Sequence, residues 1–103
     1  MASGNEMLEI NKSVGLEYIE ALKKVVEIRE SRCDQYGNSY LTDDFLFLKY
    51  QVENKMKRFG LQITRENNVE DLKNIESALD SALDAANYCI FMISKILKQA
   101  DDK

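Results

Sequence analysis

Apolar residues recur every three or four positions in three segments of the chain, which is the spacing of an amphipathic helix. The first segment runs from Ser13 to about Arg32, and its apolar positions are Leu16, Ile19, Leu22 and Val26. The period then breaks between Asp34 and Leu41, where Gly37 and Asn38 both tolerate positive φ. The pattern predicts a first helix followed by a connecting loop.

The second segment has a clear start and a clear end. Thr42 is a good N-cap, and Asp43 and Asp44 would place negative charge in the first turn, where the helix dipole favours it. The apolar stripe consists of Phe45, Leu48, Val52, Met56 and Phe59. Gly60 is suited to the position just after a helix. We therefore expect a second helix that ends near Phe59.

The third segment follows a polar connection from Leu61 to Asn67. Asn68 and Asp71 are spaced as a helix-capping pair. The apolar stripe consists of Val69, Leu72, Ile75, Leu79, Leu83, Ala86, Ile90, Ile93 and Leu97. The pattern predicts a third helix of about thirty residues.

Three such helices predict an all-α fold, an antiparallel bundle in one domain. Proline is absent and glycine occurs four times in 103 residues, which suits long helices and leaves few turns for a sheet. Residues 1–12 are expected to form a mobile N-terminal arm, and residues 13–103 the helical domain. The run from Ala85 to Ile93 is apolar nearly all round. Because two neighbours cannot bury that whole surface, we expect a homo-oligomer, the alternative being a monomer that folds its arm over the run.

Composition excludes several kinds of chemistry. The chain has no histidine, which rules out histidine-dependent catalytic triads and imidazole metal sites. Its two cysteines, Cys33 and Cys89, are too far apart in the sequence for a CxxC motif and are expected to be free thiols. No basic, apolar leader and no long apolar run are present. We therefore expect a cytoplasmic protein without a membrane segment.

The charge is unevenly distributed. Fourteen basic and eighteen acidic residues give a net charge of −4, which argues against a duplex-DNA partner. The stretch from Lys49 to Arg65, however, contains five basic residues and a single acidic one, Glu53, which gives it a local charge of +4. This basic island is either a solvated helix face or a docking place for phosphates or an acidic partner.

A polar ridge runs along the third helix. Glu76, Asp80, Asp84 and Asn87 are spaced four, four and three residues apart, so the last three share one side of the helix. Carboxylates one turn apart repel each other unless a cation compensates them, and Mg²⁺ prefers carboxylate oxygens. The ridge is either an exposed acidic face or a set of metal ligands. Because a repulsive pair is relieved, the Asp84→Asn substitution should leave the fold intact or slightly stabilised, and it should abolish Mg²⁺-dependent ligand binding.

The second helix carries a basic counterpart. Gln51, Lys55 and Arg58 lie on one flank of its apolar stripe. If helices two and three pack as a hairpin, these bases and the carboxylates either line one cleft with metal and phosphates between them, or form direct salt bridges. In the preceding loop, Tyr36 and Asn38 either contact a nucleotide base or serve as packing and turn residues.

Together these motifs resemble the nucleotide modification associated domain family, which is common in phages and related to the MazG-like all-α nucleoside triphosphate pyrophosphohydrolases. The resemblance rests on three short motifs in order. They are Tyr36-Gly37-Asn38-Ser39, Asn54-Lys55 with Arg58, and Asp80 with Asp84 and Asn87-Tyr88. It implies that Asp80 and Asp84 bind Mg²⁺, that Lys55 and Arg58 bind phosphates, and that Tyr36, Asn38 and Asn87 lie near the nucleotide.

The chain differs from the MazG-like pattern in its carboxylates. Ser81 occupies the position three before Asp84, and Met56 the position three after Glu53, where those enzymes carry acidic residues. Two hypotheses follow. In the first, the protein binds a nucleoside phosphate with Mg²⁺ and hydrolyses it to a monophosphate and pyrophosphate, with Glu76 orienting water as the catalytic residue. In the second, the same scaffold sequesters nucleotides or binds a host protein without turnover, for example as a phage antagonist of host defence.

Overall fold

The computed structural model describes residues 13–36, 42–64 and 68–101, and this part of the chain is all-helical. The elements are the helices α2 (Leu16–Tyr36), α3 (Phe45–Gly60) and α4 (Ile75–Asp101) and the short 3₁₀ helix η2 (Val69–Asp71). The all-α prediction is confirmed. The expected mobile arm, residues 1–12, lies outside the described residues. None of the helices in the described ranges is long and apolar enough to cross a membrane.

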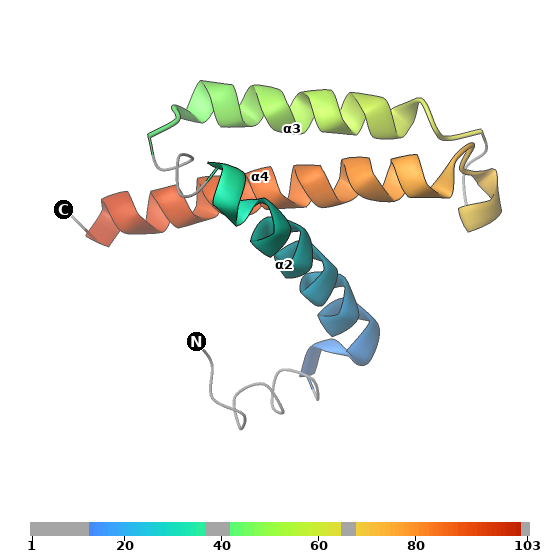
Figure 1. Cartoon of the computed structure of the whole chain (residues 1–103), viewed down its shortest axis with the longest axis horizontal. Helices are drawn as coiled ribbons and strands as arrows, with labels where there is room; N and C mark the ends of the chain where they lie inside the picture. Colours follow the sequence, from blue (N-terminus) through green and yellow to red (C-terminus); the bar gives the residue numbers. More distant parts are fainter. Residues whose placement is uncertain (1–12, 37–41, 65–67, 102–103) are drawn as a thin grey trace.

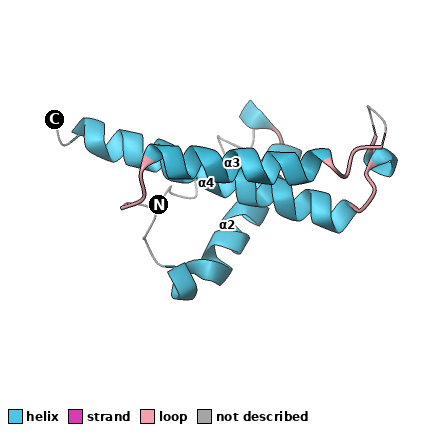
Figure 2. Ribbon diagram, turned by 90° about the horizontal axis from the view of Figure 1, so that it is seen from above, coloured by secondary structure: helices cyan, strands magenta, loops and turns pink. Residues whose placement is uncertain are grey.

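Helices α3 and α4 lie side by side and antiparallel, as a helical hairpin (Figure 1). The C-terminal half of helix α2 lies against α4, whereas its N-terminal half projects away from the hairpin (Figures 1 and 2). Most of the contacts between helices therefore join α3 to α4. In a single copy, α2 does not close the hairpin into a compact three-helix bundle.

The start and end of α2 differ from the sequence-based prediction. The helix begins at Leu16, directly after Gly15, which has a φ of 93° that other residues rarely adopt. It continues to Tyr36, so Asp34 and Gln35 are helical and not part of a loop. No residue between Arg32 and Tyr36 is a proline or glycine, and the helix has no physical reason to stop there.

The ends of α3 are set by different residues from those expected. Asp44, and not Thr42, is the N-cap, because its carboxylate accepts a hydrogen bond of 2.7 Å from the backbone N–H of Phe47. The helix ends at Gly60, one residue beyond the predicted end. Gly60 is part of the helix and does not have the positive φ of a glycine cap. Instead the backbone N–H of Leu61 bonds back to the carbonyl of Lys57.

The third predicted helix is divided in two. Asn68 and Asp71 do pair, since the Asp71 carboxylate accepts from the Asn68 backbone N–H, but they cap η2 and not the long helix. The backbone of Thr64 donates to the Asp71 carbonyl, and that of Lys73 to the Gln62 carbonyl. These non-local bonds compete with helical ones. Helix α4 therefore starts only at Ile75, where the Asn74 side chain accepts from the backbone N–H of Ser77.

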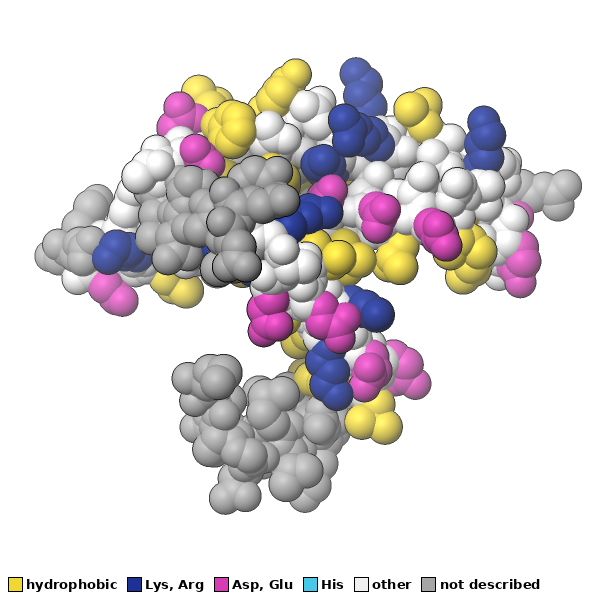
Figure 3. All heavy atoms as spheres, in the orientation of Figure 1, with side chains coloured by type: hydrophobic (Ala, Val, Ile, Leu, Met, Phe, Trp, Pro, Cys, Tyr) yellow, Lys and Arg dark blue, Asp and Glu magenta, His cyan; other side chains and the backbone are white. Residues whose placement is uncertain are grey.

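The core of a single copy is small. Leu48 on α3 is fully buried, and the other buried apolar residues are Ile19, Val25, Ala78, Leu83 and Ala85. Many residues of the predicted apolar stripes are instead exposed, contrary to their expected burial. They are Leu16, Leu22, Val26, Phe45, Met56, Val69, Ile75, Leu79, Ile90, Ile93 and Leu97. Figure 3 shows apolar side chains along the edge of α4 on the side toward which α2 projects.

Candidate functional site

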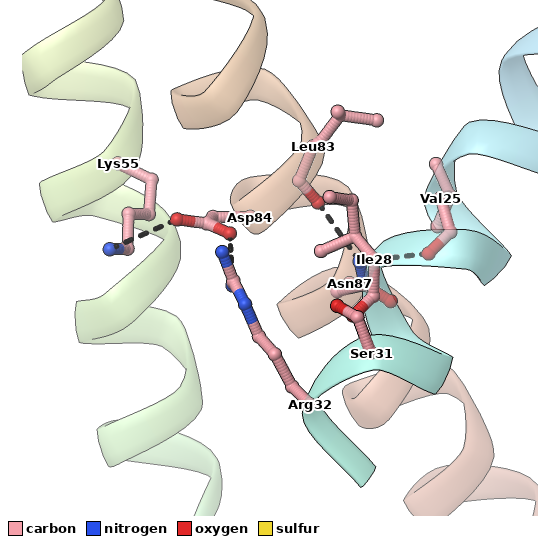
Figure 4. Close-up of polar contacts among 8 residues, drawn as sticks. All are labelled: Val25, Ile28, Ser31, Arg32, Lys55, Leu83, Asp84 and Asn87. Carbon is pink, nitrogen blue, oxygen red and sulfur yellow. Dashed lines mark hydrogen bonds and ion pairs between the residues drawn. The ribbon is translucent and has the colours of Figure 1, made fainter. Parts of the chain in front are cut away.

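The three helices meet at Asp84, near the middle of α4. Its Oδ1 lies 2.5 Å from Nη1 of Arg32 on α2, and its Oδ2 lies 3.3 Å from Nζ of Lys55 on α3 (Figure 4). We call Arg32, Lys55 and Asp84 the Asp84 cluster. It holds two positive charges and one negative charge, and each charge comes from a different helix. The carboxylate thus links α2 and α3 through α4.

The Asp84 cluster is partly shielded from solvent. The side chain of Asp84 is 14% exposed and that of Lys55 is 17% exposed, whereas Arg32 is 46% exposed. Charge-assisted bonds strengthen where water is excluded, so the Lys55–Asp84 pair contributes more than an ordinary surface ion pair. Arg32 is the more accessible cation. Of the two cations, Lys55 is therefore the inner one and Arg32 the outer one.

Asn87 lies one turn after Asp84 and is buried. Its side-chain amide Nδ2 donates to the backbone carbonyls of Val25 on α2 and Leu83 on α4, each at 3.2 Å (Figure 4). A buried amide requires such partners, because leaving it unpaired would be costly. Asn87 therefore anchors α2 on α4 beside the Asp84 cluster. Its predicted place near a nucleotide stays a prediction.

The other predicted site residues are more dispersed. Glu76, Asp80 and Arg58 are exposed, and among the described residues none of the three takes part in an ion pair. Asp80 is one helical turn before Asp84, and Glu76 is two turns before it, about 12 Å along the axis. Tyr36 is the last residue of α2. The side chain of Tyr36 and the whole of Asn38 lie outside what the structure describes.

The structure brings the predicted base Lys55 and the predicted ligand Asp84 into direct contact. The direct salt bridge across the hairpin, one of the two alternatives read from the sequence, is thus present. It also changes the expectation for Asp84→Asn. The repulsion between Asp80 and Asp84 is compensated at Asp84 by two cations, so removal of this charge no longer relieves an unopposed repulsion.

The donor set fits a divalent cation only if a ligand supplies further oxygens. Among the described residues, no group of three or more acidic, cysteine or histidine side chains is arranged to hold a metal. Asp80 and Asp84 offer two carboxylates one turn apart, and Mg²⁺ commonly takes one or two carboxylates together with substrate phosphates and water. Arg32 and Lys55 each occupy one lone pair of the Asp84 carboxylate, and its other lone pairs remain available to a metal ion.

Two further contacts of cations were missed by sequence reasoning. Lys95 on α4 is buried; its Nζ donates to the backbone carbonyl of Asp43 and lies 4.7 Å from the ring centre of Phe45. Arg29 on α2 lies 5.2 Å from the ring centre of Phe91 on α4. Both contacts join helices that are distant in sequence. The position of Lys95 within the apolar C-terminal half of α4 was the feature of the sequence that could have indicated a buried lysine.

Comparisons with protein-family models, with curated proteins and with solved structures give no significant match.

Proposed function

We propose that the protein is a MazG-like helical homo-oligomer that binds a nucleoside phosphate together with Mg²⁺. The observation that supports this proposal is the Asp84 cluster, in which two bases from different helices flank one carboxylate. Arginine and lysine are suited to phosphate oxygens, and a carboxylate is suited to the cation that accompanies them. The resemblance to the nucleotide modification associated domain family points in the same direction.

In this proposal the candidate site residues have different roles. Lys55 and Arg32 bind phosphate oxygens, and Arg58, one turn beyond Lys55 on α3, extends the basic surface. Asp84 and Asp80 hold Mg²⁺, which when bound neutralises phosphate charge. Tyr36, Asn38 and Asn87 are assigned to the nucleotide by the resemblance alone, and Asn87 acts by fixing α2 beside the cluster.

Hydrolysis to a monophosphate and pyrophosphate is the enzymatic form of the proposal. Glu76, two turns before Asp84 on the same helix, would orient the water that attacks the α-phosphorus, so that the bond to the β-phosphate breaks and pyrophosphate leaves. A second candidate is a module without turnover that sequesters nucleotides or binds a host protein, as a phage antagonist of host defence would. It is favoured by the lack of a group of three carboxylates among the described residues.

The test combines product analysis with thermal stabilisation. The wild-type protein is incubated with a panel of ribonucleoside and deoxyribonucleoside triphosphates and Mg²⁺, and products are separated by ion-exchange chromatography. Pyrophosphate and monophosphate, lost in Glu76→Gln but kept in the exposed control Glu70→Gln, would support the enzyme. A raised melting temperature without product would support sequestration. If no nucleotide gives a product and none raises the melting temperature, nucleotide binding is contradicted.

A further inference from the structure

The exposed edge of α4 carries a regular apolar repeat. Its members, which we call the α4 stripe, are Leu79, Leu83, Ala86, Ile90, Ile93 and Leu97. Their spacing alternates between four and three residues over almost three heptads, which is the pattern of positions a and d in a coiled coil. Leu79, Ile90, Ile93 and Leu97 are between 41% and 61% exposed. A seam of this kind is normally covered by another helix.

Apart from Leu83, which is buried, the members of the α4 stripe remain at least partly exposed beside α3 and α2. Ala78, Ser81 and Ala85 form a buried side of α4, which lies about 130° around the helix from the centre of the stripe. Asn87, which bonds to α2, lies about 100° around the helix in the other direction from Ala86. The stripe is therefore a third side of α4, left open between its two neighbours (Figure 3).

The exposed apolar side chains agree with an incomplete assembly. Leu79, Ile90, Ile93 and Leu97 lie within the described residues, and each keeps at least two fifths of its surface exposed. Obligate interfaces bury about 1,000–2,500 Å² on each partner and are more apolar than transient ones. A seam of this length and composition is therefore typical of an interface.

A second copy fits the stripe better than the N-terminal segment does. From Leu79 to Leu97 the stripe extends about 27 Å. Residues 5–12 contain only three large apolar side chains, Met7, Leu8 and Ile10, which correspond to about one helical turn. An identical stripe on a second copy matches the full length, because a two-fold axis places the same surface on both partners.

We infer that two copies of this chain pair through their α4 stripes, with knobs-into-holes contacts along Leu79, Ala86, Ile90, Ile93 and Leu97. The pairing is independent of the Asp84 cluster. Asp84 lies about 160° around α4 from Ala86, on the opposite side of the helix, and stays accessible in the dimer. The interface consequently forms without nucleotide, and the nucleotide proposal and this one are tested by different measurements.

The experiment is sedimentation equilibrium of the nucleotide-free protein, with helicity followed by circular dichroism. The wild type is expected at twice 11.9 kDa, with a melting temperature that rises with protein concentration. Ile93→Glu is expected to sediment as a helical monomer. Leu46→Glu, at a residue that is 75% exposed on α3, is the matched control and is expected to stay dimeric.

Three results would overturn the inference: a monomeric wild type whose melting temperature is independent of concentration, a dimeric Ile93→Glu, or dissociation of the Leu46→Glu control. Should Ile93→Glu lose its helicity, the smaller change Ile93→Ser and the concentration dependence of the wild type decide the question without it. A tenfold or larger weakening of dimerisation in Ile93→Ser supports the pairing, and an unchanged dimer contradicts it.

Discussion

Replacing Asp84 by Asn removes the negative charge between Arg32 and Lys55 while almost preserving the volume of the side chain. Lys55, only 17% exposed, is then left without a counter-charge, and the ion pair that joins α2 to α4 is lost. We expect the variant to be less stable than the wild type. Relief of the repulsion from Asp80 acts in the opposite direction but is worth only a few tenths of a kcal/mol.

The magnitude lies between two limits. Exposed ion pairs contribute about 0–1 kcal/mol, and removing one partner of a fully buried pair costs about 3–5 kcal/mol. Asp84 and Lys55 are 14% and 17% exposed, whereas Arg32 is 46% exposed. Solvent therefore screens the Arg32–Asp84 pair and reduces its contribution to stability. We therefore expect the free energy of unfolding to fall by about 2 kcal/mol, a decrease in melting temperature of about 10 °C for a domain of this size.

The assay is urea unfolding followed by circular dichroism, at one protein concentration for all variants. The control Asp80→Asn changes an exposed carboxylate one turn away and should alter stability by less than about 0.5 kcal/mol. In a Lys55→Gln background, Asp84→Asn should cost about 1 kcal/mol less than in the wild type. If Asp84→Asn equals or exceeds the wild type in stability, the Asp84 cluster does not contribute as described.

Three other side chains make contacts whose loss can be measured. Asn74→Ala removes the N-cap of α4 and should cost about 1 kcal/mol in urea unfolding; a change near zero would mean that α4 is capped by another group. Asn87→Ala removes the bonds to Val25 and Leu83, so we expect a loss of about 2 kcal/mol and faster amide hydrogen exchange in α2 than in α3; equal exchange in both helices would argue against the anchor. Lys95→Met removes the bond to the Asp43 carbonyl and should cost about 1–2 kcal/mol, and an unchanged midpoint would show that water replaces the lysine.

Periodicity predicts the helices well because it depends on neighbouring residues only. The stripe through Leu48 identifies α3, and its predicted end differs from the observed one by a single residue. The division between η2 and α4 was not predictable in this way. It depends on two backbone hydrogen bonds, from Thr64 to the Asp71 carbonyl and from Lys73 to the Gln62 carbonyl, which form only once the chain has turned back on itself.

Burial was predicted less well than helicity. Ile90 and Ile93 have the spacing of core residues, yet both are exposed in one copy. The sequence cannot indicate which partner covers an apolar stripe, because a neighbouring helix and a second copy of the chain require the same pattern. Only the structure shows that α2 diverges from the hairpin and therefore leaves part of the stripe uncovered (Figure 2).

The candidate site was predicted in part. Lys55 and Asp84 could be chosen from helical spacing, and the hairpin brings them together. Arg32 was overlooked because the first helix was expected to end at that residue, and its contact with Asp84 spans 52 positions of sequence. A buried asparagine such as Asn87 within an apolar run indicates a polar contact, but the sequence does not indicate whether a carbonyl or a ligand provides it.

Phosphate binding at the Asp84 cluster is tested by isothermal titration calorimetry, in which nucleoside triphosphates with Mg²⁺ are titrated into the wild type, Lys55→Gln and Lys57→Gln. Lys57 is an exposed lysine on the same helix and serves as the matched control. We expect binding to the wild type and to Lys57→Gln, and at least tenfold weaker binding to Lys55→Gln. Equal affinities for the two variants, or no heat of binding with any nucleotide, would contradict a phosphate site at the Asp84 cluster.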